Sequence, residues 1–228
     1  MRTHKFQRLR HTIINVMLIA MIALLYCAMS GGASVPATGA DIIYKTENKG
    51  TVALECVIAW DGQYIAEILD ILRTEDARIS FVVQGSWADR NRDMLRQIIS
   101  DGHSILTCGM NYEDTASLSQ EELAASIKNA AALTEQITGS KVTAYYCPTD
   151  DVSKAMRAAK KAGFDCVRCT VDLLSARGNS EEIKMRAKNS LQDGSIVAFT
   201  PTAALTEALS DILAMYRKAG LSVCGVEC

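Results

Sequence analysis

The chain has 228 residues, of which 49% are hydrophobic and 22% are charged, a balance typical of a globular domain joined to one apolar segment. The formal net charge is −2, and without the four basic residues before that segment, 20 Lys and Arg stand against 26 Asp and Glu. No basic run follows the apolar segment, so nucleic acid is excluded as an expected partner.

The first 29 residues have the pattern of a membrane-targeting segment. Residues 1–12 carry four basic side chains, Arg2, Lys5, Arg8 and Arg10. Residues 13–29 are an apolar run that would span roughly 26 Å as a helix, slightly less than a bilayer core. The pattern predicts a transmembrane signal anchor with a cytoplasmic N-terminus, or alternatively a cleaved signal peptide. We expect the anchor, with the remaining chain on the extracytoplasmic side of the cell membrane, because the run is longer than most signal-peptide cores.

Residues 30–41 are small and polar and include a proline, so they are interpreted as a linker to a single domain at 42–228. Seven of the eight cysteines follow the apolar run, and an odd number leaves at least one without an intrachain disulfide. Cys166 and Cys169 form a C-x-x-C on a predicted strand. Residues three apart on a strand point to opposite faces, so we expect core residues there and no zinc site.

Beyond residue 42 the pattern alternates between strands and helices. Apolar runs predict strands at 52–59, 79–84, 103–107, 141–146, 164–171, 195–200 and 221–226. Apolar residues at helical spacing predict helices at 64–72, 87–100, 119–139, 151–162, 180–191 and 202–219. The helix after Ser119 begins with a capping box and ends at Gly139. This order predicts an α/β fold with a parallel sheet, either a distorted or incomplete (β/α) barrel or an open doubly wound sheet.

In both architectures a functional site is expected at the carboxyl ends of the strands. The residues predicted there are Trp60, Asp61, Cys108, Cys147, Pro148, Asp150, Asp172 and Thr200. We expect Asp150 and Asp151 to begin the next helix. His103 is the only histidine after the apolar run, and we expect it to have a structural role.

Six stretches resemble the polysaccharide deacetylase (NodB-homology) family, in family order and spacing, and within it the sporulation-associated type. They are VALECVIAWDGQYIAEILDIL, ARISFVVQGSWADRN, DGHSILTCGMNYED, ITGSKVTAYYCPTDD, KKAGFDCVRCTVDLL and DGSIVAFTP. IIYKTENKGTVAL, before the first of them, also resembles the sporulation type. The resemblance covers essentially all of 42–228. It implies a distorted (β/α) barrel whose enzymes remove N-acetyl groups from glycans with one divalent metal.

The positions that carry the family's general base and metal ligands hold other residues. The family's first motif ends in an Asp that serves as general base, and Val57 stands at that position. Ile58 aligns with an Asp that binds metal in many members. The two metal-binding histidines of the second motif correspond to Cys108 and Tyr112. The resemblance therefore implies the metal-binding scaffold without its ligands, and we expect no cofactor.

The remaining catalytic positions are also changed. The Arg that orients the base corresponds to Tyr146, and the last motif's His, which is the general acid, corresponds to Thr200. Of the family's pair of prolines, only Pro148 is kept. Amide hydrolysis needs a metal-activated water, a base and an acid for the leaving amine. Neither Val57 nor Ile58 can accept a proton, so the sequence predicts a pseudoenzyme.

A replacement metal site is the alternative. Asp61, Cys108, Cys147 and Asp150 are expected near one rim, and thiolates with carboxylates can hold zinc or another divalent metal. The simpler interpretation is that small residues fill a redundant cavity while the aspartates, Asp172 included, have structural roles.

The leading hypothesis is an inactive deacetylase-like domain that binds glycan or assists assembly in the cell wall or spore envelope. Six residues are substrate-groove candidates: Trp60, Asp61, Tyr112, Tyr146, Pro148 and Asp172. Trp87 and Tyr145 are further aromatic candidates, with burial in the core as the simpler reading of Trp87. Two alternatives remain: a metal-dependent hydrolase removing N-acetyl groups from peptidoglycan or a related glycan, and a structural protein that pairs with another envelope protein.

Overall fold

The computed structural model describes residues 17, 42–58, 62–112 and 117–227. The predicted basic segment, anchor and linker lie outside the described residues except for Met17. In the described part of the chain, no helix is both long and apolar enough to cross a bilayer.

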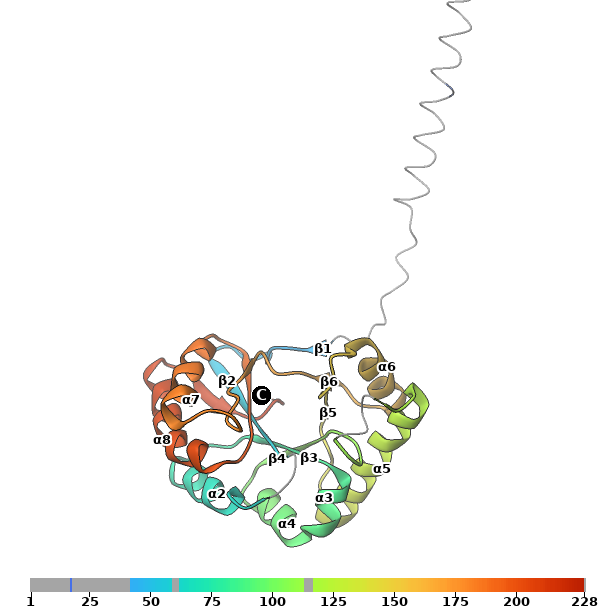
Figure 1. Cartoon of the computed structure of the whole chain (residues 1–228), viewed down its shortest axis with the longest axis horizontal. Coiled ribbons are helices and arrows are strands. Elements are labelled where there is room, and N and C mark those ends of the chain that lie inside the picture. The colour runs from blue at the N-terminus through green and yellow to red at the C-terminus, as the bar shows by residue number, and fades with distance from the viewer. Residues whose placement is uncertain (1–16, 18–41, 59–61, 113–116, 228) are drawn as a thin grey trace, which may run out of the picture. The chain divides into compact units, whose positions relative to one another are not determined.

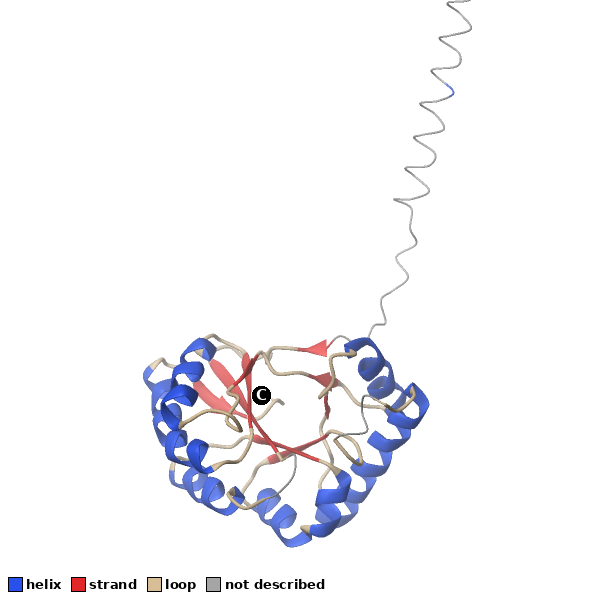
Figure 2. Ribbon diagram, in the orientation of Figure 1, coloured by secondary structure: helices blue, strands red, loops and turns tan. Residues whose placement is uncertain are grey.

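The described elements alternate along the chain (Figures 1 and 2). The strands are β1 (Ile42–Ile43), β2 (Thr51–Val57), β3 (Ser80–Val83), β4 (Ser104–Thr107), β5 (Tyr145–Tyr146), β6 (Cys166–Val167), β7 (Val171–Asp172), β8 (Ser195–Phe199) and β9 (Ser222–Cys224). The helices are α2 (Ile65–Thr74), α3 (Gly85–Arg90), α4 (Arg92–Ser100), α5 (Gln120–Thr138), α6 (Val152–Ala162), α7 (Ser180–Ala187) and α8 (Ala203–Lys218), with a 3-10 turn, η2 (Lys188–Ser190).

The strands form one curled parallel sheet in the order β1-β6-β5-β4-β3-β2-β8-β7, and β9 adds to β2. In the described residues β7 does not pair with β1. Instead, Lys45 makes an isolated antiparallel bridge to Ser195 at the start of β8, so the segment after β1 crosses the gap. Figure 2 shows the strands curled into an incomplete ring, with the helices outside it. The predicted curled α/β architecture is confirmed, and the open doubly wound alternative is wrong.

Residues of β2 alternate between the two faces of the sheet, as a strand requires. Val52, Leu54 and Cys56 pack outward with the helices, whereas Ala53 and Val57 belong to the cluster inside the ring. Both faces are buried, which explains why the run is almost continuously apolar. The interior cluster comprises Ala53, Val57, Val82, Leu106, Cys108, Ala144, Tyr146, Val167, Ile196, Ala198 and Val226.

Helix boundaries follow their local signals where those signals are strong. Ser119 and Glu122 form the predicted capping box, and Gly139 ends α5 in the left-handed conformation at φ 72°. Asp151 caps α6 by accepting a hydrogen bond from the Lys154 N–H, as expected for a helix start. The predicted helix at 87–100 is wrong as a single element. It is divided into α3 and α4 at Asn91, whose ψ of 44° interrupts the helix.

The cysteines are distributed as core residues rather than as a metal knuckle. Cys166 packs under the helices, whereas Cys169 packs toward the interior of the ring, which confirms the predicted opposite faces. Cys224 is disulfide-bonded. Cys56, Cys108, Cys147, Cys166 and Cys169 are free thiols.

His103 has the structural role that the sequence predicts. Its Nδ1 accepts a hydrogen bond of 3.2 Å from the Ile79 N–H, and its ring meets Phe81 edge-on at 5.2 Å. Burial lowers the pKa of His103 from 6.5 to about 4, so the imidazole is neutral at physiological pH. The neutral ring can therefore act as an acceptor within the core.

The tail after β9 enters the amino-terminal end of the ring. The Val226 N–H donates to Ser80 Oγ at 2.9 Å, and the Val226 side chain joins the interior cluster. A Cβ on Gly225 would lie 2.9 Å from Ser80 Oγ and 3.0 Å from Ser104 Oγ. A side chain does not fit at residue 225 without displacement of its neighbours, and this explains the glycine.

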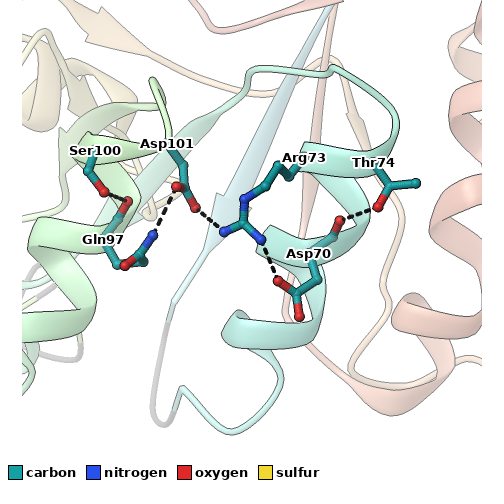
Figure 3. Close-up of polar contacts among 6 residues, drawn as sticks. All are labelled: Asp70, Arg73, Thr74, Gln97, Ser100 and Asp101. Atoms are coloured by element: carbon teal, nitrogen blue, oxygen red, sulfur yellow. Dashed lines mark hydrogen bonds and ion pairs between the residues drawn. The ribbon is translucent and has the colours of Figure 1, made fainter.

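A polar network joins the outer helices α2 and α4 (Figure 3). Arg73 donates to Asp70 at 2.6 Å and to Asp101 at 2.9 Å, and Gln97 donates to Asp101 at 2.9 Å. Hydrogen bonds from Thr74 to the Asp70 carbonyl and from Ser100 to the Gln97 carbonyl lie beside it. These contacts are on the outer surface of the ring and do not form part of the site.

Candidate functional site

The family's catalytic positions lie where the parallel strands end. Val57 is the last residue of β2, Cys108 follows β4, and Tyr146 is the last residue of β5. Thr200 follows β8, which lies next to β2 in the sheet. The fold therefore brings these positions to one mouth of the ring, as the sequence predicts.

The positions of the base and of one metal ligand are apolar and buried. Val57 is 6% exposed and packs inside the ring, whereas Ile58 is fully buried and packs outward against the helix-facing core. The Ile58 N–H donates to the Val82 carbonyl at 3.0 Å. Neither side chain can take up a proton or bind a cation.

The two positions of the metal-binding histidines hold neutral groups. Burial raises the pKa of the Cys108 thiol to about 12. Burial also raises the pKa of Tyr112 to about 12, with smaller contributions from Cys108 and Asp172. The Tyr112 N–H donates to Gln84 Oε1 at 3.0 Å, which fixes the loop after β4. Both groups are therefore protonated at neutral pH, and neither is the imidazole that the family has at these positions.

The remaining catalytic positions are bound within the structure. Tyr146 is 7% exposed, burial raises its pKa well above the usual range, and it lies in the interior cluster against which Cys169 packs. The Thr200 N–H donates to Ser175 Oγ at 2.8 Å, and the Ser175 hydroxyl lies 2.8 Å from the Thr200 carbonyl oxygen. Neither residue offers a group that titrates near neutrality.

Glu55 is a buried acid that the sequence reasoning did not identify as part of the site. It lies between Ala53 and Val57 on the inward face of β2, it is fully buried, and neither carboxyl oxygen has a hydrogen-bond partner. Burial raises its pKa from 4.5 to about 8. The available signal was a lone glutamate within an otherwise apolar run.

The mouth residues that the structure describes do not fit a divalent metal. Among the described residues, no group of three or more His, Cys, Asp or Glu side chains could hold a metal ion. Cys108 packs inside the ring, whereas Cys147 packs on the helix-facing side. Asp150 is exposed and pairs with Arg168 at 3.0 Å, and Asp61 lies outside the described residues. The structure therefore does not bring Cys108, Cys147 and Asp150 together.

The predicted groove residues have different environments. Asp172 is exposed at the end of β7 and accepts a hydrogen bond of 2.8 Å from the Leu174 N–H. Pro148 and Tyr112 are partly buried, and Tyr146 is nearly buried. Trp60 lies outside the described residues. Trp87 and Tyr145 are 1% and 0% exposed. The core position preferred for Trp87 is therefore confirmed, and Tyr145 is a core residue rather than a groove residue.

Comparisons with known proteins agree with this fold. YlxY of Bacillus subtilis (strain 168), whose function is uncharacterized, is 24% identical over 186 residues, covering 79% of this chain. The alignment covers 58% of that relative, so the chain spans less than two thirds of its length. A mutant of BA3943 from Bacillus anthracis, described as a CE4 family pseudoenzyme with restored enzymatic activity, has a TM-score of 0.76 and 23% identity. That alignment covers 82% of this chain and 70% of the BA3943 chain.

The Bc1960 peptidoglycan N-acetylglucosamine deacetylase has a TM-score of 0.75 at 18% identity. The alignment covers 85% of this chain and 94% of the Bc1960 chain. At these identities the structures establish the fold alone. A family model described as polysaccharide deacetylase matches residues 44–167, which are 124 of the 228 residues. The protein therefore belongs to the polysaccharide deacetylase family.

Proposed function

We propose that this protein is a catalytically inactive member of the polysaccharide deacetylase family that acts by binding glycan in the cell wall or spore envelope. The observation that supports inactivity is the composition of the mouth. Val57, Ile58 and Thr200 offer no base, no metal ligand and no acid, and Cys108 and Tyr112 remain protonated at neutral pH. Hydrolysis of an N-acetyl group has no chemical support there.

The proposal of glycan binding rests on the retained scaffold and on the relatives. Bc1960 is named as a peptidoglycan N-acetylglucosamine deacetylase, and BA3943 is named as a pseudoenzyme of the same family. In this chain the partly buried Tyr112 ring and the exposed Asp172 carboxylate lie at the mouth. An aromatic face and a hydrogen-bond acceptor are suitable for a sugar ring, because aromatic side chains offer apolar area with fixed geometry.

We further propose that residues 13–29 anchor the protein in the cell membrane, with the domain on the extracytoplasmic side. The basic residues before this apolar run and the small, polar residues after it support this placement. A partner protein in the envelope is part of the same proposal. Membrane fractionation of cells expressing the full chain tests the anchor, and a soluble, shortened product would indicate cleavage.

Acetate release tests the proposed inactivity. The full chain, purified in detergent under reducing conditions with zinc or cobalt supplied, is incubated with N-acetylated peptidoglycan, and Bc1960 serves as the positive control for the assay. We expect no acetate above background from this chain and no stoichiometric metal. Metal-dependent acetate release that is lost in Cys108→Ala would show that the hydrolase alternative is correct.

Cosedimentation with purified peptidoglycan tests glycan binding. We expect the full chain to sediment with the polymer and Tyr112→Ala to bind several-fold more weakly. Met185→Ala is the matched control, because Met185 is a 67% exposed apolar side chain on α7, an outer helix. The proposal would be contradicted if the folded wild-type chain did not cosediment, or if both variants lost binding to the same extent.

A further inference from the structure

A leucine at the mouth is both exposed and held in a left-handed backbone conformation. β7 runs parallel to β8, so the residues after β7 lie at the carboxyl end of the sheet, beside Thr200. Among them, Leu174 is 41% exposed and has a φ of 49°. At positive φ the Cβ atom of an L-residue crowds the backbone, which makes this conformation unfavourable for a leucine. The structure therefore presents an apolar side chain at the mouth on a strained backbone.

Hydrogen bonds on both sides of Leu174 hold this conformation. Its N–H donates to Asp172 Oδ1 at 2.8 Å, and its carbonyl accepts a hydrogen bond of 2.9 Å from the Arg177 N–H. The hydroxyl of the next residue, Ser175, bonds both the N–H and the carbonyl of Thr200, each at 2.8 Å. A strained residue persists where the surrounding structure determines its conformation in this way. The turn is therefore rigid and is joined to the end of β8.

The turn itself does not require a leucine. Both hydrogen bonds of Leu174 use its backbone atoms, so a glycine would make them without strain. The described residues with positive φ are seven glycines, Leu174 and Asp76. Asp76 follows the C-cap of α2, where a left-handed backbone is common and Asp tolerates it. Leu174 has no such explanation. A single exposed apolar residue is ordinary, but one on a strained backbone at a candidate site indicates a function for the side chain.

The neighbour of Leu174 on this turn indicates what the side chain binds. Asp172 is exposed, and its carboxylate has a second oxygen, Oδ2, that can accept a hydrogen bond from a hydroxyl. The bond from the Leu174 N–H to Oδ1 fixes the carboxylate beside the leucine. A sugar ring has hydroxyls at its edge and C–H groups on its faces, and ligand sites combine apolar side chains with a few fixed polar groups. The pair is therefore suited to one sugar ring.

We propose that Leu174 is a binding residue of the glycan site, where it contacts the C–H face of a sugar ring while Asp172 accepts a hydroxyl of the same sugar. This inference rests on the proposed function, because it requires that glycan binds at the mouth. It adds an apolar contact after β7 to the Tyr112 ring in the loop after β4. Because the turn is already fixed, binding orders little further backbone, which favours affinity. The strained backbone lowers stability for the sake of this placement.

Cosedimentation of the full chain with purified peptidoglycan, together with thermal unfolding, tests this assignment. Leu174→Asn removes the apolar contact, and Asn adopts the left-handed conformation more readily than Leu. We expect this variant to bind at least about threefold more weakly than wild type, which is the loss of a small apolar contact. Its melting temperature should stay within about 3 °C of wild type, because relief of strain offsets the lost burial. Leu174→Met keeps an apolar side chain and should bind within about twofold of wild type.

Asp76→Asn is the matched control, because Asp76 is the other non-glycine residue with positive φ and lies before β3, at the opposite end of the sheet. It should bind as tightly as wild type. If Leu174→Asn does not fold, Leu174→Gly removes the same side chain together with the strain. Wild-type binding in the Asn or Gly variant, or a loss in Leu174→Met equal to that in Leu174→Asn, would overturn this inference, and glycan binding itself stands if Tyr112→Ala still binds more weakly. Failure of the folded wild-type chain to sediment would overturn both.

Discussion

Replacing Glu55 with glutamine should change how the stability of this protein depends on pH. Glu55 is fully buried inside the ring, and neither of its carboxyl oxygens has a hydrogen-bond partner. Burial without a partner disfavours the charged form, which is why its pKa rises from 4.5 to about 8. Glutamine keeps the size of the side chain and cannot ionise, so Glu55→Gln removes the titration and little else.

The sign and size of the effect follow from this pKa. Between pH 4.5 and 8 the folded protein keeps a proton that the unfolded chain has lost. Unfolding therefore releases a proton, and the free energy of unfolding falls as the pH rises. At about 1.4 kcal/mol per pKa unit, the full loss is roughly 5 kcal/mol, and most of it is complete near pH 8. The stabilising contribution is fully present below about pH 4.5.

Urea unfolding of the full chain at several pH values measures this loss. The informative range is pH 6.5 to 8, because His103 is neutral in the folded state there and at most half protonated in the unfolded state, whose pKa is 6.5, so that both proteins share its small contribution. Over this range wild-type stability should fall by roughly 2 kcal/mol, while Glu55→Gln should lose almost none of it. Near pH 5 the two proteins should differ far less.

Parallel stability curves for wild type and Glu55→Gln would refute the reasoning. They would mean that Glu55 reaches water or finds a partner when it ionises, so that the charge is not held in an apolar interior. Glu67→Gln is the matched control, because Glu67 is an exposed glutamate on α2. It removes one carboxyl by the same substitution and should follow the wild-type curve.

Three further predictions concern stability. His103→Asn should flatten the pH dependence of stability on the acid side. Because the buried imidazole stays neutral down to about pH 4, the wild-type free energy of unfolding falls by roughly 3 kcal/mol between pH 6.5 and 4, which urea unfolding can measure. Gly225→Ala should lower the free energy of unfolding, measured by thermal unfolding, by roughly 1–3 kcal/mol. Adding Ser104→Ala to the same chain should restore part of that stability, because it removes an oxygen 3.0 Å from the new Cβ. Tyr216→Phe should lower the free energy of unfolding in urea by about 1 kcal/mol. Ser190→Ala should lower it more, because this variant leaves the buried Tyr216 hydroxyl, 2.7 Å from Ser190 Oγ, without its partner. Equal losses in the two variants would contradict that order.

The order of strands and helices could be predicted because each long element carries a strong local signal. The run at 52–59 and the capping box at Ser119 are examples, and both describe real elements. The break at Asn91 could not be predicted, because no glycine or proline marks it and the apolar spacing continues through it. The strand expected at 164–171 is divided into β6 and β7, each only two residues long, because β6 pairs with β5 and β7 pairs with β8 on the far side of the gap.

The candidate site was predicted by position but only partly by contact. Resemblance placed Val57, Cys108 and Tyr146 correctly at one mouth of the ring. It also placed Cys147 near Cys108, and the alternation of the strand corrects this. Tyr146 points inward, so the next residue, Cys147, must point outward. That rule was available from the sequence, whereas the position of Cys147 and Cys166 in one buried cluster requires the pairing of β5 with β6.

Glu55 does not take over the role of the general base that is missing at Val57. It lies two residues before Val57, about 6.6 Å deeper along the strand, and at neutral pH it is mostly protonated because its pKa is about 8. A general base must be ionised, and a metal ligand must carry charge or a free lone pair directed at the ion. The neighbouring Cys108 and Tyr112 stay neutral too, with pKa values of about 12. The interior of the mouth thus holds several ionisable groups that are predominantly uncharged at neutral pH, and this is a stronger argument for inactivity than the loss of any single catalytic residue.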